Sequence, residues 1–321
     1  MNPTSDMSVD PPSQEPLPYH STPAKTVQWK INEQHWDQEK TIVIRVEDEL
    51  FKVNLSRLTD ISEGFNALLG LPGVDGTLEN PLYMGESVSK KEFRAFLDWI
   101  KHTAWKPLPS DDKDLLLSIL KISSKWMCKP GMQYAVNSLE LHSLDPWRKL
   151  ELAQTYGIPI WVERAIPILI DIPLYLFTAE HQTQIGTIAF FEIAKAQSRI
   201  ERERHVLATM APPLFDGSSK CPYHGSAMHS QPKCNRAWNE AWWAKFGIQF
   251  LHPTKPLDFK LAFEFVRSTD FPGVTPDCKY EAQVRIVGCF DVEAKIKRAV
   301  VDVILALLPM GPLQREEEIS I

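Results

Sequence analysis

The stretch TIVIRVEDELFKVNLSRL, residues 41–58, carries the main prediction about the fold. Apolar residues alternate with other residues on both sides of an acidic corner at Glu47, Asp48 and Glu49. Two short runs with period two predict a β-hairpin with one buried face, although the corner lacks an Asn-Gly or Asp-Gly pair. From Ser56 onward the apolar spacing becomes helical, so the hairpin is expected to lead directly into helices. The alternating set is Ile42, Ile44, Val46, Phe51, Val53 and Leu55, and the helical set is Leu58, Ile61, Phe65, Leu68 and Leu69.

The next segments predict an edge strand and several capped helices. The short run PLYM begins with Pro81, which suits the first residue of an edge strand. Ser89 is expected to open a helix, and Ser110 is expected to cap the following one with acidic residues in its first turn. Further on, Asp145 is the predicted N-cap of a helix that stops at Gly157.

The remainder of the chain predicts mainly helices. Thr178 is expected to cap one long helix, whose charged end RIERERH should project into solvent. Residues 206–235 are rich in Pro, Gly and Ser and predict a long loop. After it, YEAQVRIVGCF at residues 280–290 predicts a strand, and EAKIKRAVVDVILALL at residues 293–308 predicts a closing apolar helix.

Composition limits the classes of function. The chain has 321 residues and a net charge of −6, which argues against a nucleic-acid or anionic-membrane surface. The most apolar run, residues 158–177, is interrupted by Glu163, Arg164 and Asp171, so we expect a buried helix and no membrane span. Five cysteines and no apolar leader in the first residues predict reduced thiols in a cytoplasmic or nuclear protein.

No catalytic signature is present in the sequence. It has no Gly-rich phosphate loop, no Gly-x-Ser-x-Gly elbow, no His-Glu-x-x-His motif and no dinucleotide fingerprint. Scattered Asp and Glu residues on helices are usually solvated. We therefore expect no catalysis, no catalytic residue and no organic cofactor.

One cysteine- and histidine-containing loop is compatible with zinc. Thiolates and imidazoles are the ligands that tetrahedral zinc prefers, but the paired Cys-x-x-Cys knuckle is missing. The alternative is that the thiols are buried or incidental and the histidines face solvent. A zinc-binding or thiol-dependent protein is thus an alternative of another functional class. The candidate ligands, none of which is assigned, are Cys221, His224, His229, Cys234 and Cys278.

Three tryptophans near the end of this loop allow two interpretations. Trp238, Trp242 and Trp243 lie at positions i, i+4 and i+5, so two of them share a helix face. Exposed rings could bind a peptide or a base, but flanking basic residues are absent. A packed helix face is the preferred interpretation.

Taken in order, these segments resemble the BTB/POZ domain in the form abundant in fungal proteins. The similarity rests on VIRVEDELFKV, on Leu58, Ser62 and Phe65, on NPLYMGESVSKKEFRAFLDWI and on LLLSILKISSKWMCKPGMQYAVNSL. Residues 141–205 resemble the helical BACK-type extension of such proteins. In two places the chain departs from the family: Asn54 stands where His is frequent, near the dimer centre, and Asp48 stands where Gly is common in the corner.

The resemblance implies an α+β fold with a small sheet packed against helices, followed by a mainly helical C-terminal region. The predicted parts are a disordered tail at 1–36, a BTB/POZ-like domain at 37–140, a BACK-like extension at 141–205 and a mostly helical region at 206–321. The implied function is protein–protein interaction, as a scaffold that pairs with itself or with another BTB/POZ protein. The resemblance implies that the pairing uses the first helices and the segment before the hairpin, but no individual partner-binding residue is assigned. The alternative within this class is a substrate adaptor that binds a cullin scaffold.

Overall fold

The computed structural model describes residues 30–32, 41–71, 73, 75–102, 112–214, 231–252 and 255–313, which form a mixed α+β structure. Four strands make one sheet in the order β1-β3-β2-β4. They are β1 (Lys30–Ile31), β2 (Thr41–Val46), β3 (Glu49–Asn54) and β4 (Leu82–Tyr83). The pair β2–β3 is antiparallel, whereas β1 and β4 each add a parallel edge strand. The predicted edge strand after Pro81 is confirmed, and β1 lies within the predicted tail 1–36.

The predicted hairpin is confirmed, and its corner is a two-residue turn. Glu47 and Asp48 connect the strands, and Glu47 takes a positive φ of 54°. Ile44 pairs with Phe51, and both side chains are completely buried. Val43, on the opposite side of the strand, is buried as well, so the outer face of β2 is not open to solvent.

Five helices follow the hairpin, and the first four of them pack against the sheet. They are α1 (Leu55–Thr59), α2 (Glu63–Leu69), α3 (Lys90–Ile100), α4 (Lys113–Lys125) and α5 (Lys129–Glu140). Apolar residues of the hairpin form one buried cluster with α1–α4, which we call the sheet core, whereas the buried residues of α5 lie outside it. Its members include Ile42, Ile44, Val46, Phe51, Val53, Leu58, Phe65, Leu82, Phe93, Phe96, Leu97 and Ile122.

The remaining helices form an elongated arm. They are α6 (Pro146–Tyr156), α7 (Pro159–Asp171), α8 (Ala179–Ile185), α9 (Thr187–Thr209), α10 (Gln231–Trp242), α11 (Ile248–Phe250), α12 (Phe259–Ser268), α13 (Pro276–Phe290) and α14 (Val292–Leu305). A 3-10 turn, η2 (Leu174–Leu176), follows α7, and a π-helical turn, η3 (Trp243–Gly247), follows α10. Their buried apolar residues form a second cluster, the helical core, which runs from Leu116 on α4 to Ile304 on α14. Helices on both sides of residue 140 therefore share one core.

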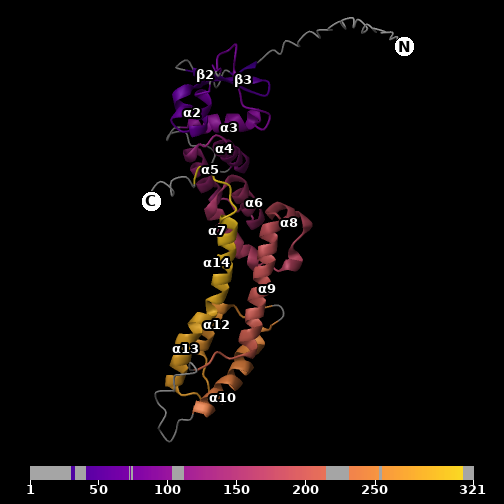
Figure 1. Cartoon of the computed structure of the whole chain (residues 1–321), viewed down its shortest axis with the longest axis vertical. Coiled ribbons are helices and arrows are strands. Elements are labelled where there is room, and N and C mark those ends of the chain that lie inside the picture. The colour runs from indigo at the N-terminus through magenta and orange to yellow at the C-terminus, as the bar shows by residue number, and fades with distance from the viewer. Residues whose placement is uncertain are drawn as a thin grey trace, which may run out of the picture.

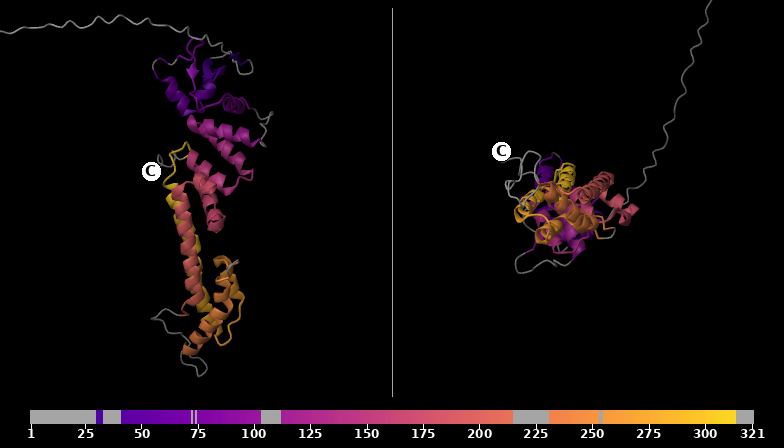
Figure 2. Two further views of the ribbon diagram at one scale, coloured as in Figure 1. Left: turned by 90° about the vertical axis from the view of Figure 1, so that its right-hand side faces the viewer. Right: turned by 90° about the horizontal axis from the view of Figure 1, so that it is seen from below.

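Two long helices connect the middle of the molecule with its far end. The sheet and α1–α3 lie at one end, and α10, α12 and α13 lie at the other (Figure 1). Between them α9 runs away from the sheet end and α14 returns along it, packed on both α7 and α9. The left view of Figure 2 shows the same elongated arrangement from the side, and the right view looks along its long axis. The predicted closing helix is confirmed by α14, which brings the C-terminal part of the chain back to the middle.

Three local predictions are wrong. Residues 280–290 belong to helix α13, because apolar residues lie on both of its faces, with Ile286 buried and Val284 exposed; this double-sided pattern imitates a buried strand. Thr178 caps only the short helix α8, since Gly186 at φ 78° separates it from α9. The N-cap of α4 is Asp112 and not the predicted Ser110: the Asp112 side chain accepts hydrogen bonds from the backbone amides of Asp114 and Leu115.

The chain segment that follows α14 lies against the turn between α6 and α7. The predicted cap and stop of α6 are confirmed: Asp145 caps it, and Gly157 ends it in a left-handed conformation at φ 65°. A Cβ atom at Gly157 would lie 2.5 Å from the carbonyl oxygen of Pro309 and close to Gly311. We call residues 306–313 the C-terminal strap. Its close approach to Gly157 requires glycine at the turn.

Candidate functional site

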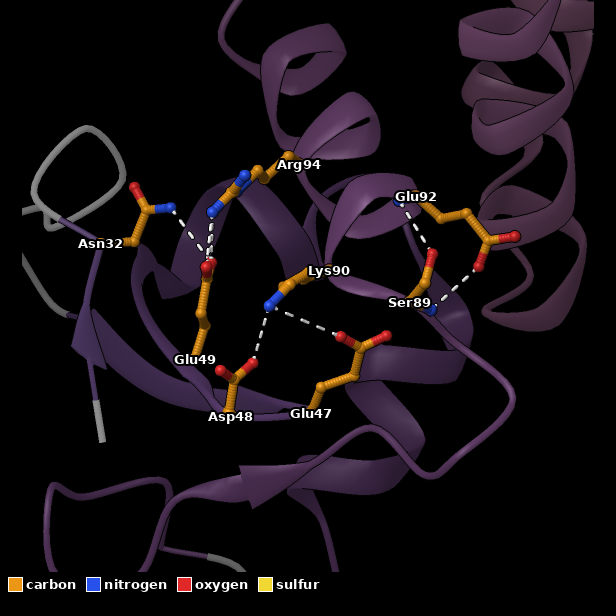
Figure 3. A network of polar contacts seen from close by, with 8 residues as sticks. All are labelled: Asn32, Glu47, Asp48, Glu49, Ser89, Lys90, Glu92 and Arg94. Carbon is orange, nitrogen blue, oxygen red and sulfur yellow. Dashed lines mark hydrogen bonds and ion pairs between the residues drawn. The ribbon is translucent and has the colours of Figure 1, made fainter. Parts of the chain in front are cut away.

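A network of charged residues ties the hairpin corner to the start of α3 (Figure 3). The Glu49 carboxylate is buried and accepts from Nη2 of Arg94 at 2.5 and 2.7 Å. Because β1 runs parallel to β3, Asn32 lies beside the same carboxylate, with Nδ2 3.5 Å from Oε2. Removing Arg94 would leave a buried charge without its counter-ion, so this pair fixes α3 on the sheet.

The exposed part of the network is centred on Lys90. Its ammonium lies 2.9 Å from Asp48 Oδ1 and 3.9 Å from Glu47 Oε2. The hydrogen bond from Lys90 lowers the pKa of Asp48, and the same bond raises the pKa of Lys90. Both groups are exposed, so solvent and salt screen this interaction.

The start of α3 carries a capping box, as the prediction for Ser89 requires. Ser89 Oγ accepts from the Glu92 amide at 3.3 Å, and Glu92 Oε2 accepts from the Ser89 amide at 2.9 Å. Lys121 on α4 donates to the other carboxylate oxygen at 2.7 Å. Burial would raise the pKa of Glu92, but the hydrogen bonds from Lys121 and Ser89 outweigh burial and lower this pKa. The corner network therefore joins β3, α3 and α4, which is a structural role.

Helices α1 and α2 are each capped by a buried polar side chain. Asn54 Oδ1 accepts from the Arg57 amide at 3.3 Å and from Ser56 Oγ at 2.7 Å. Ser62 Oγ accepts from the Phe65 amide at 3.1 Å and donates to the Trp126 carbonyl. Asn54 thus serves as the N-cap of α1.

The end of α4 holds α2 in place. The Gly64 amide donates to the Trp126 carbonyl at 3.1 Å, and a Cβ on Gly64 would lie 2.6 Å from that oxygen. The rings of Phe65 and Trp126 stack with centroids 4.6 Å apart. These contacts fix the orientation of α2 relative to the end of α4.

Apolar side chains on and near α1 and α2 pack against the sheet core but stay partly exposed. Leu71, two residues after the end of α2, leaves 54% of its surface exposed, while the others are half-buried. We call this set the α1–α2 face. It comprises Leu55, Ile61, Leu68, Leu69 and Leu71.

The candidate zinc ligands are only partly described. Cys221, His224 and His229 lie outside the described residues. Cys234 on α10 and Cys278 on α13 are both buried in the helical core. Within the described ranges, no group of three or more His, Cys, Asp or Glu side chains could hold a metal ion. The zinc hypothesis therefore stays a prediction.

Another buried thiol, Cys128 at the start of α5, has a perturbed pKa. Burial raises the pKa of Cys128 to about 11. A thiol with this pKa is protonated at neutral pH and is a poor nucleophile. Cys128 packs in the sheet core, where it behaves as a small apolar residue.

The tryptophan interpretation is confirmed at two of three positions. Trp238 and Trp242 are buried, and their indole N–H groups donate to the carbonyls of Pro212 and Leu207 at 2.9 and 2.6 Å. Trp243 is 49% exposed, because its position at i+5 lies beside the face that Trp238 and Trp242 share. For Trp243 the prediction of a core position is wrong.

An exposed apolar group beside α9 could not be recognised in the sequence. The run at residues 158–177 predicts a buried helix, and this is confirmed for α7. The following turn η2 instead presents Leu174, Tyr175 and Leu176 to solvent, as Ile188 and Phe191 do on the first turns of α9. The sequence gives one indication of this exposed group, which is an apolar run after Pro173 that lacks a helical period.

In comparisons with known proteins, no family model, no curated protein and no solved structure matches the chain. Among the helices of the described residues, none has the length and apolar content needed to cross a membrane.

Proposed function

We propose that this chain is a protein-interaction module of the BTB/POZ type that pairs with a second copy of itself, or with another such domain, and performs no catalysis. The order of hairpin, two short helices, edge strand and helices is the order that the resemblance implies. Packing of these elements into one sheet core supports the same proposal.

The observation that carries the proposal is the α1–α2 face. Helix α2 is fixed by the Ser62–Trp126 and Gly64–Trp126 hydrogen bonds, and α1 is capped by Asn54, so the apolar side chains are held in one orientation. A rigid surface loses little conformational entropy on binding. Leucines and an isoleucine that stay partly exposed on such a surface gain free energy when a partner covers them. The α1–α2 face is accordingly the proposed centre of the dimer.

The test is the molar mass of the full chain at increasing concentration, measured by light scattering or sedimentation equilibrium. Leu71→Glu places a charge on the exposed rim of the face and should weaken pairing at least tenfold without unfolding the protein. Leu68→Glu, closer to the centre, should weaken it further. Leu141→Glu is the matched control, because Leu141 is an exposed leucine at the end of α5.

The expected result is a mass above that of the monomer for the wild type and for Leu141→Glu, with a clear decrease for Leu71→Glu. A wild-type chain that stays monomeric at high micromolar concentration would contradict the proposal. Equal association of Leu71→Glu and wild type would also contradict it, provided that their melting temperatures agree.

A further inference from the structure

The exposed apolar side chains beside the start of α9 form a second candidate contact surface. We call Leu174, Tyr175, Leu176, Ile188 and Phe191 the α9 patch. Tyr175 is 85% exposed and Phe191 is 62% exposed. Contacts on both sides of η2 hold it along α9: before it, the carbonyls of Ile170 and Ile172 accept from Gln197 Nε2 at 2.9 and 2.6 Å, and after it, Phe177 contacts Phe190.

Aromatic rings beneath the patch hold it rigidly. Phe177, which directly follows η2, contacts Phe190 with ring centroids 5.7 Å apart. Phe177 also packs edge-to-face on Trp147 of α6, with ring centroids 4.5 Å apart. Trp147 in turn stacks with His181, with ring centroids 4.1 Å apart. The exposed side chains of η2 and α9 therefore project from a packed base. A surface of this kind needs little ordering when it binds.

The size of the patch matches one half of a protein interface. At 150–250 Å² for a whole aromatic side chain, Tyr175 and Phe191 together expose roughly 220–370 Å². With the three aliphatic side chains, which are 38–58% exposed, the apolar area is on the order of 400–500 Å². A stable interface buries about 800 Å² on each partner, of which somewhat more than half is apolar.

Charged side chains near the patch are paired within the chain. Lys195 lies over the Phe191 ring at 6.0 Å from its centroid and pairs with Glu192 at 3.3 Å. Asp171, three residues before η2, pairs with Lys297 at 2.6 Å. A two-fold contact brings identical surfaces together, so unpaired charges of a single sign would repel the second copy. Charges that are neutralised within the chain do not oppose such a contact.

We infer that the α9 patch is a second homotypic contact, through which this chain pairs with another copy of itself. The inference does not rest on the proposed pairing through the α1–α2 face. That face belongs to the sheet end, whereas the α9 patch lies on the arm (Figure 1). One copy can use both surfaces at once, and two different two-fold contacts on one chain build assemblies larger than a dimer.

The experiment combines two sets of substitutions in the full chain. Tyr175→Ser with Phe191→Ser removes the aromatic part of the α9 patch, and Leu71→Glu changes the α1–α2 face. Tyr280→Ser is the matched control, because Tyr280 is an exposed tyrosine on α13 at the far end of the arm. Molar masses are measured by sedimentation equilibrium at one high micromolar concentration.

The expected wild-type mass exceeds that of a dimer. The α9-patch variant and Leu71→Glu should each reduce the mass to a dimer, and their combination should give a monomer. Tyr280→Ser should leave the wild-type mass unchanged. If only the proposed function is wrong, Leu71→Glu has no effect while the α9-patch variant still halves the mass.

Two results would overturn the inference. One is an identical mass for the wild type and the α9-patch variant. The other is a mass that increases when residues 1–29 are deleted, because that segment of the same chain would then be the occupant of the patch. Tyr175→Cys offers an independent measurement: a two-fold contact at the patch predicts an intermolecular disulfide under mild oxidation, which Tyr280→Cys should not form.

Discussion

The sheet end and the arm of this molecule are held together by contacts of different range along the chain. In the sheet end, the hairpin pairs with itself, and α3 and α4 follow within about a hundred residues. In the arm, the closing contacts join distant segments: Arg298 of α14 bonds Glu163 of α7, and Arg204 of α9 bonds Glu293. Local contacts form early in folding, whereas distant ones must first offset a larger loss of chain entropy. The arm should therefore depend on its last segment in a way that the sheet end does not.

The largest effect on the arm, with the least effect on the sheet end, is expected from a truncation that ends the chain at Asp291. This truncation removes α14 and the strap, and with them the buried side chains Ile296, Val300, Val301 and Ile304. At about 1.5–3 kcal/mol each, their loss removes roughly 6–12 kcal/mol, which is comparable to the whole stability of a domain. Amides of α7 and α9 should lose most of their hydrogen-exchange protection, whereas amides of β2 and β3 should keep theirs.

A chain ending at Leu313 is the control for this truncation. It retains α14 and the strap and should show the exchange pattern of the full chain. Unchanged protection of α7 and α9 after truncation at Asp291 would show that the arm does not need its closing helix. Loss of protection in the hairpin as well would show that the two regions unfold as one unit.

The same difference in range explains what could be predicted from the sequence. The hairpin, the edge strand and the caps at Ser89 and Asp145 depend on residues close to one another, and each was predicted. Residues 280–290 of α13 were predicted as a strand, because apolar residues on both faces of this helix hide the helical period in the sequence. Gly157 was predicted as a helix stop, but its contact with Pro309 depends on a segment about 150 residues away.

The candidate surfaces were predictable to a smaller extent. Trp238 and Trp242 could be assigned to the core from their spacing, whereas Trp243, one residue beyond their shared face, could not be assigned in the same way and is half-exposed. The apolar residues of α1 and α2 were recognised, whereas their partial exposure depends on how α4 packs behind them. Leu174–Leu176 fall in a run predicted to be buried, because the sequence does not tell an exposed apolar turn from a packed one.

Two phenylalanines, one buried in the sheet end and one exposed on the arm, should differ in their contribution to stability. Phe51 is completely buried and packs edge-to-face on Phe93, with ring centroids 5.1 Å apart. Phe51→Ala should lower the free energy of unfolding by about 3–5 kcal/mol, through lost burial and the remaining cavity. Phe191→Ala, at an exposed site on α9, should change it by less than about 0.5 kcal/mol. Urea denaturation of dilute protein measures both; equal effects would mean that one of the two burial assignments is wrong.

A smaller effect is expected where the strap meets the arm. Gly157→Ala puts a side chain on a residue with positive φ, at a cost of about 1–2 kcal/mol, and also forces Pro309 away, so the total should reach about 2–3 kcal/mol. Gly73→Ala is the control, since Gly73 has φ 85° but a methyl group added there would meet nothing within 4 Å. It should show the backbone cost alone. Thermal unfolding of both variants measures the difference, and equal decreases would mean that the strap contributes nothing to stability.

The smallest expected effect concerns Glu92, which links the sheet end to α4. Because the folded-state pKa of Glu92 lies below its ordinary value of 4.5, its contribution to stability is fully present above pH 4.5 and is lost as the pH falls through the folded-state pKa. Glu92→Gln can keep the capping hydrogen bond but loses the charge that faces Lys121. The variant should be less stable than the wild type by about 0.5–1 kcal/mol at pH 7, and the difference should shrink as the pH falls below 4.5 and through the folded-state pKa. Glu79→Gln, in an exposed loop, should show no such pH dependence in urea denaturation. A difference that stays constant from pH 7 to pH 3 would mean that the Glu92 charge does not hold α3 against α4.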